Sequence, residues 1–176
     1  MPQRNTKRRA LKSLLIVGEG AHDRAFVDHL KSLYDQRKSG QTVTVRAGDG
    51  GSPRDLLKRM VRCYQHKDYD QRVLLLDDDV GVTQPARDIA RKHDIEMILS
   101  SPVCLEGMLL DVLGVSIPST AQSCKSSLRP MLDGHPAEKR SYQRCFPQSL
   151  LDQSTNLALA RLRVLISNHS TSSIDP

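Results

Sequence analysis

The chain has few aromatic residues: of its 176 residues, four are Tyr, two are Phe and none is Trp. A protein that stacks single-stranded bases on exposed rings needs more aromatic side chains, so we do not expect that kind of binding platform. No apolar run approaches the ~20 residues that span a bilayer, and the N-terminus lacks the apolar segment of a secretory signal. These features predict a cytoplasmic protein with no membrane partner.

Cysteine is also scarce, and no two cysteines form a C-x-x-C pair. This spacing does not predict a zinc site or a redox motif, and reduced thiols inside the cell are the simplest interpretation. The length of the chain suits a single domain. The four cysteines are Cys63, Cys104, Cys124 and Cys145.

Positive charge is in excess but unevenly spread, with a net charge of +6. Residues 1–60 carry 13 basic and 6 acidic side chains, whereas residues 61–120 carry 6 basic and 10 acidic ones. The basic arms favour a polyanionic partner such as nucleic acid, although solvated helix faces can have the same composition. An acidic centre would repel that partner unless a cation neutralised it.

Short apolar runs alternate with amphipathic segments along the first two thirds of the chain. Apolar or β-branched runs predict strands at residues 13–18, 41–46, 72–76 and 95–99. Helical periodicity and start signals predict helices at residues 22–38, 53–64, 83–93 and 103–113. Beyond residue 118 the pattern weakens, and it predicts helices at residues 121–132 and 150–167.

Repeated strand–helix alternation predicts an α/β fold with a mostly parallel, Rossmann-like sheet of four or slightly more strands and helices on both faces. We expect this core to span residues 13–115 and a helical C-terminal extension packed on it to span residues 116–170. Residues 1–12 form the predicted basic, flexible tail, and residues 171–176 form a second flexible tail.

Carboxylates follow several of the predicted strands. Glu19 follows the first strand, Asp77 and Asp79 follow the third, and Glu106 lies shortly after the fourth, while Asp23 is one helical turn beyond Glu19. Ligands bind at the carboxyl ends of the strands in such sheets, so these side chains can meet at one edge. Their mutual repulsion favours a hard divalent cation, which suits phosphoester cleavage. Solvated turn carboxylates are the alternative interpretation.

Four segments favour the metal site over solvated turn carboxylates, because their shared order along the chain matches that of a known family. They are VGEGAHDRAF, GDGGSPRDLLKRM, YDQRVLLLDDD and SSPVCLEGMLL. In this order they resemble the TOPRIM domain of the RloB-like family, which is related to the OLD-family nucleases, and the resemblance extends over residues 14–113. Four positions depart from the family pattern. Asp23 stands where the family usually has Glu, Met108 replaces a Trp, and Pro102-Val103 replaces Asn-Pro.

The resemblance implies a TOPRIM fold and a metal-dependent nuclease, with Mg²⁺ (or Mn²⁺) as cofactor. Glu19 would be a metal ligand or the general acid/base. Asp77 and Asp79 would hold the metal, and Asp23 and Glu106 would complete the site. The family association also implies a role in phage defence and a partner protein encoded nearby, an ATPase or a restriction component.

Basic side chains outside these segments are candidates for contact with a phosphate backbone. An alternative is a non-catalytic module that binds nucleic acid or nucleotide and works with a partner protein. A phosphorylation switch is disfavoured, because the acidic strand end comes too late in the chain. His22, near Glu19, is a candidate for assisting proton transfer, but we expect it to be only a helix-start residue. The predicted nucleic-acid contacts are Arg8, Arg9, Lys125, Arg129, Lys139, Arg140 and Arg144.

Overall fold

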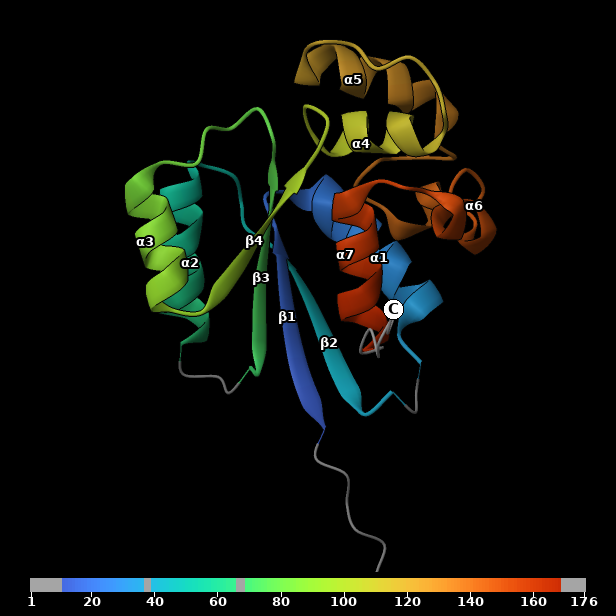
Figure 1. Ribbon diagram of the computed structural model, residues 1–176. Helices are drawn as coiled ribbons and strands as arrows, with labels where there is room; N and C mark the ends of the chain where they lie inside the picture. The colour runs from blue at the N-terminus through green and yellow to red at the C-terminus, as the bar shows by residue number, and fades with distance from the viewer. Residues whose placement is uncertain (1–10, 37–38, 66–68, 169–176) are drawn as a thin grey trace, which may run out of the picture.

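The computed structural model describes residues 11–36, 39–65 and 69–168. Its centre is a four-stranded sheet in the order β2-β1-β3-β4, and every neighbouring pair is parallel (Figure 1). The predicted α/β fold with a parallel sheet is therefore confirmed. The strands are β1 (Lys12–Gly18), β2 (Gln41–Ala47), β3 (Gln71–Asp77) and β4 (Ile95–Ser100).

Alternate residues of β1, β3 and β4 enter two separate cores, because successive side chains point to opposite faces of a sheet. On β1, Leu14 and Ile16 join the larger core, whereas Leu15 and Val17 join the smaller one. Helix α1 (Ala21–Tyr34) covers the first face, and helices α2 (Pro53–Tyr64) and α3 (Gln84–Lys92) cover the second (Figure 1). The two central strands, β1 and β3, are covered on both faces and each carries four successive buried apolar residues, whereas the edge strand β2 alternates between buried and more exposed residues.

The C-terminal part packs onto the larger core. It comprises helices α4 to α7 and two short 3₁₀ helices. Tyr142 and Phe146 lie against Phe26 of α1, with ring centroids 5.5 and 5.9 Å apart respectively. The elements are α4 (Leu105–Val112), α5 (Ala121–Leu128), η1 (Arg129–Met131), η2 (Lys139–Tyr142), α6 (Gln148–Gln153) and α7 (Leu157–Ser167).

Two helix predictions in this part are wrong in detail. The helix predicted at 150–167 is broken into α6 and α7, because the side chain of Asn156 accepts a hydrogen bond from the Leu159 amide and caps α7. The helix predicted at 121–132 ends at Leu128, and Pro130 lies in the 3₁₀ turn that follows.

The predicted basic tail lies mostly outside the described residues, and so do Arg8 and Arg9. Lys12, which that prediction included, is the first residue of β1. The second predicted tail, residues 171–176, also lies outside the described part of the chain. Among the helices that the structure describes, none has the length and apolar character needed to cross a membrane.

Gly18 ends β1 where the backbone of α1 approaches it closely. A side chain there would collide with Cβ of Asp23 and would lie 3.1 Å from the Arg24 nitrogen. Gly81 is a matched control, because a Cβ there would meet no described atom within 4 Å.

We predict that Gly18→Ala lowers the free energy of unfolding by about 1–3 kcal/mol, the usual cost of overpacking. Gly81→Ala should change it by less than about 0.5 kcal/mol. Urea unfolding of the two variants beside the wild type checks this. Equal unfolding midpoints for the two variants would contradict the close approach of α1 to β1.

Candidate active site at the carboxyl edge of the sheet

Four carboxylates line one cavity of about 280 Å³ at the carboxyl edge of the sheet. Glu19 follows β1, Asp77 ends β3, and Glu106 lies in the first turn of α4, just after β4. Asp23 reaches the cavity from the first turn of α1. Segments far apart in sequence thus bring together four of the five carboxylates that the sequence singles out.

Asp77 is held in place by the backbone around it. One oxygen of its carboxylate accepts a hydrogen bond of 3.0 Å from the Leu105 amide at the start of α4. Its own amide donates to Glu19 Oε2 at 3.4 Å. Burial raises the pKa of Asp77 to about 6, and the nearby charges of Glu19 and Glu106 act in the same direction, against the Leu105 hydrogen bond.

Asp23 has a more strongly raised pKa than Asp77. Its side chain is buried, and Oδ2 accepts a hydrogen bond of 2.9 Å from the Gly20 amide. Oδ1 is buried with no hydrogen-bond partner among the residues that the structure describes. Burial, followed by repulsion from Asp77 and Glu106, raises the pKa of Asp23 to about 7. An oxygen in this position needs a proton or a cation.

His22 and Glu106 form a pair across the cavity, although 84 residues separate them in sequence. Nδ1 of His22 lies 2.9 Å from Oε1 of Glu106, which is only 5% exposed. His22 was expected to be an ordinary helix-start residue, and this contact gives it a place in the site. Its signal in the sequence was its position, three residues beyond Glu19 at the carboxyl end of β1.

Lys125 extends from α5 into the same cavity. Partial burial opposes its charge, but attraction to Glu106 and Asp77 outweighs this effect and raises the pKa of its ammonium group. The sequence singled out Lys125 as a phosphate contact. The structure adds that this cation faces the carboxylates.

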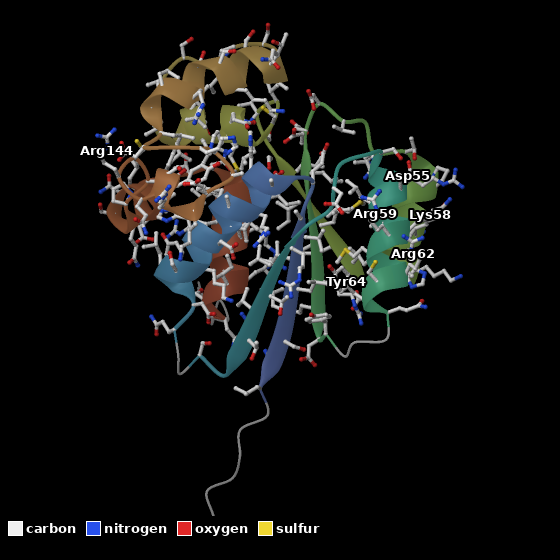
Figure 2. All side chains as sticks on the ribbon, turned by 180° about the vertical axis from the view of Figure 1, so that it is seen from behind. Asp55, Lys58, Arg59, Arg62, Tyr64 and Arg144 are labelled. Carbon is white, nitrogen blue, oxygen red and sulfur yellow. The ribbon has the colours of Figure 1, made fainter. Side chains whose placement is uncertain are left out.

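The glycine-rich turn after β2 forms another wall of the cavity. The Gly50 amide donates to the Glu19 carbonyl at 2.9 Å, and Gly50 lines the cavity. Arg59, which reaches from α2 (Figure 2), donates hydrogen bonds to the carbonyls of Gly48 and Gly50. Asp49 and Gly50 adopt left-handed conformations, with φ of 61° and 69°. These hydrogen bonds hold the turn against the backbone of Glu19, whose side chain lines the cavity.

Asp79 lies apart from the other four carboxylates. It is exposed in the turn after β3, and its amide donates to the Val103 carbonyl at 2.9 Å. It is absent from the described lining of the cavity, which ends at Asp77 along this segment. The D-x-D pattern of the sequence therefore places one carboxylate in the cavity and the other outside it.

The remaining predicted phosphate contacts are dispersed over the C-terminal part. Arg140 pairs with Glu138 at 2.6 Å, and Arg144 (Figure 2) pairs with Asp133 at 2.6 Å. Lys139 lines a separate hollow beside α1. Arg129 lines a second cavity next to the acidic one. In the part of the chain that the structure describes, Arg129 lines that second cavity together with Lys125, whereas Lys139, Arg140 and Arg144 do not line it.

The donor set bears on the metal that the sequence predicts. Among the described side chains, no group of three or more His, Cys, Asp or Glu converges closely enough to hold a metal ion. The site is therefore not an all-protein cage. Mg²⁺ often binds through one or two carboxylates together with water and substrate phosphate. One or two carboxylates from Glu19, Asp23 and Asp77 suit this second mode, and the buried Asp23 oxygen lacks a hydrogen-bond partner among the described residues.

Comparison with known proteins identifies no relative: no family model matches the chain, and no curated protein or solved structure matches it. The resemblance of its motifs to RloB-like TOPRIM domains remains a prediction from the sequence.

The raised pKa of Asp23 predicts how stability depends on pH. The folded protein keeps a proton on Asp23 up to pH about 7, whereas the unfolded chain loses it near its ordinary value of 3.8. The free energy of unfolding therefore falls as pH rises from about 4 to 7, and Asp77 contributes in the same direction.

We predict that Asp23→Asn melts several degrees above the wild type at pH 8 in EDTA, and that this difference shrinks at pH 5. Asn keeps an oxygen for the Gly20 amide but carries no charge. Asp78→Asn is the matched control, because it makes the same substitution at an exposed aspartate that directly follows β3. Thermal unfolding at the two pH values checks this, and a constant difference between wild type and Asp23→Asn would contradict it.

Proposed function

We propose that the chain is a metal-dependent nuclease of the RloB-like TOPRIM type, which hydrolyses phosphodiester bonds in nucleic acid. The observation that carries this proposal is the buried Asp23 oxygen without a hydrogen-bond partner among the described residues, next to Asp77 and Glu106 in one cavity. Carboxylates gathered in this way are unfavourable on their own, and a bound cation offsets their repulsion.

The cation would be Mg²⁺ or Mn²⁺, held by one or two of the carboxylates of Glu19, Asp23 and Asp77, with water and substrate phosphate as its remaining ligands. When bound, it would supply positive charge against the phosphate and the departing oxygen. Glu106 lies on the α4 side of the cavity and is paired with His22. We therefore assign Glu106 to orienting His22, and we take the ligands of the cation from the other three carboxylates.

The other polar side chains suit the handling of a phosphodiester. The Lys125 ammonium can donate hydrogen bonds to a phosphate oxygen, and it stabilises negative charge that grows there during attack. Glu106 fixes the His22 ring through Nδ1, so proton exchange with the reacting oxygens falls to Nε2. Glu19 is the second candidate for proton transfer, since it lines the same cavity.

A non-catalytic module that binds nucleic acid or nucleotide and works with a partner protein is the second candidate function. It is favoured by the absence, among the described side chains, of a converged group of three metal ligands. A pure binding module gains nothing from the acidic cavity. It therefore predicts that nucleic-acid binding strengthens when Asp77 is neutralised, with no cleavage by either form.

We predict that the wild type cleaves nucleic acid in Mg²⁺ or Mn²⁺ and that EDTA abolishes the cleavage. Asp77→Asn should lower the rate at least 100-fold, and Lys125→Gln about tenfold or more, in line with the loss of one stabilising group. Asp78→Asn, which removes an exposed charge beside the site, should stay within about twofold of the wild type.

The measurement is a gel assay over a panel of single- and double-stranded DNA and RNA. Cleavage that is equal in Asp77→Asn and Asp78→Asn, or unchanged by EDTA, would contradict the nuclease. Salt-sensitive binding by both variants without cleavage of any substrate would instead support the binding module.

A further inference from the structure

A second cavity of about 280 Å³ adjoins the acidic one. The two cavities share three lining residues, His22, Glu106 and Lys125. The paired side chains of His22 and Glu106 thus form the boundary between them. The far wall of the second cavity comes from α5 and from the segment that follows it, which the motif-bearing part of the sequence does not include.

The lining of the second cavity is basic where that of the first is acidic. Lys125 and Arg129 lie one helical turn apart, and both are exposed. Arg129 donates one hydrogen bond to the Gly134 carbonyl, and a guanidinium has further N–H groups to offer an anion. His135 lies nearby, with its ring centroid 6.3 Å from that of His22. These donors suit a phosphate group.

Apolar side chains complete the cavity. Leu128, Leu132 and Pro136 line it together with the basic groups. A cavity with a few cationic donors beside an apolar surface suits an amphipathic ligand with one anionic end. A nucleotide has this character, because its phosphate is charged and its sugar and base present flatter, less polar surfaces.

We propose that the second cavity binds one nucleotide of the substrate, next to the phosphodiester that is cut in the acidic cavity. Arg129 binds its phosphate, Lys125 lies between this phosphate and the one that is cut because it lines both cavities, and the apolar side chains contact its sugar and base. The identity of the ligand rests on the proposed nuclease function. A base that contacts these side chains is not stacked inside a duplex, so the substrate class is a single strand or a nucleotide drawn out of a duplex.

The test is a titration of the full chain with 5′-AMP in EDTA, in which binding is measured by isothermal titration calorimetry. We expect AMP to bind the wild type more tightly than adenosine or inorganic phosphate, each of which has half of the recognised features. Arg129→Gln should weaken AMP about tenfold. Arg91→Gln is the matched control, because it removes an exposed arginine from α3 on the opposite face of the sheet.

A second variant tests the cavity independently, in case Arg129→Gln weakens AMP binding only by disturbing the fold around it. Ser126 is an exposed α5 residue that lines the cavity. Ser126→Trp should therefore fill the cavity and lower AMP affinity at least tenfold, while the melting temperature stays near that of the wild type. No AMP binding by the wild type at millimolar concentration would overturn the proposal, and so would equal affinities of Arg129→Gln, Ser126→Trp and Arg91→Gln.

Asp77→Asn separates this proposal from the nuclease function. It should bind AMP at least as tightly as the wild type, because Asp77 lines only the acidic cavity among the two described here. AMP binding by both forms without metal-dependent cleavage would leave the nucleotide cavity standing and refute the nuclease. Cleavage without AMP binding would refute the nucleotide cavity alone.

Discussion

Repulsion among carboxylates at one edge of the sheet is the constraint on which the site depends. Parallel strands end at a common edge, so residues that follow β1, β3 and β4 meet there whatever their distance in sequence. The fold then buries part of this charge. Asp23 is enclosed at the start of α1, and Asp77 is anchored by the Leu105 amide. Both carboxyl groups respond with raised pKa values.

The surrounding structure compensates for this charge in two ways. Lys125 faces the carboxylates from α5, and His22 pairs with Glu106. Neither contact reaches Oδ1 of Asp23, which has no hydrogen-bond partner in the described part of the chain. This remaining oxygen is the reason for inferring an external cation. The neighbouring basic cavity then provides a place for the substrate that such a cation would help to bind.

The sequence predicted the elements whose signals are local. Apolar runs such as Leu14–Val17 mark the strands, and Ser52 before Pro53 marks the start of α2, where its hydroxyl accepts a hydrogen bond from the Asp55 amide. The convergence of Glu19, Asp23, Asp77 and Glu106 followed from strand order, because the carboxyl ends of parallel strands share one edge.

Features that depend on tertiary contacts were not predictable in this way. Lys125 was a candidate only as a basic residue, since nothing in the sequence places α5 over the sheet edge. The contact between His22 and Glu106 joins residues from opposite ends of the motif-bearing region. The position of Asp79 outside the cavity depends on the turn after β3, where its backbone bonds to Val103.

The most direct test of the account is a thermal-shift titration of the metal-free protein with Mg²⁺ and Mn²⁺, comparing the wild type with the double variant Asp23→Asn/Asp77→Asn. A ligand of the folded state at 100 times its Kd adds about 2.7 kcal/mol, or several degrees in Tm for a chain of this size. The account predicts a saturable rise for the wild type and none for the double variant, which starts from a higher Tm at pH 8. Equal responses of the two proteins, or no response from either, would contradict it.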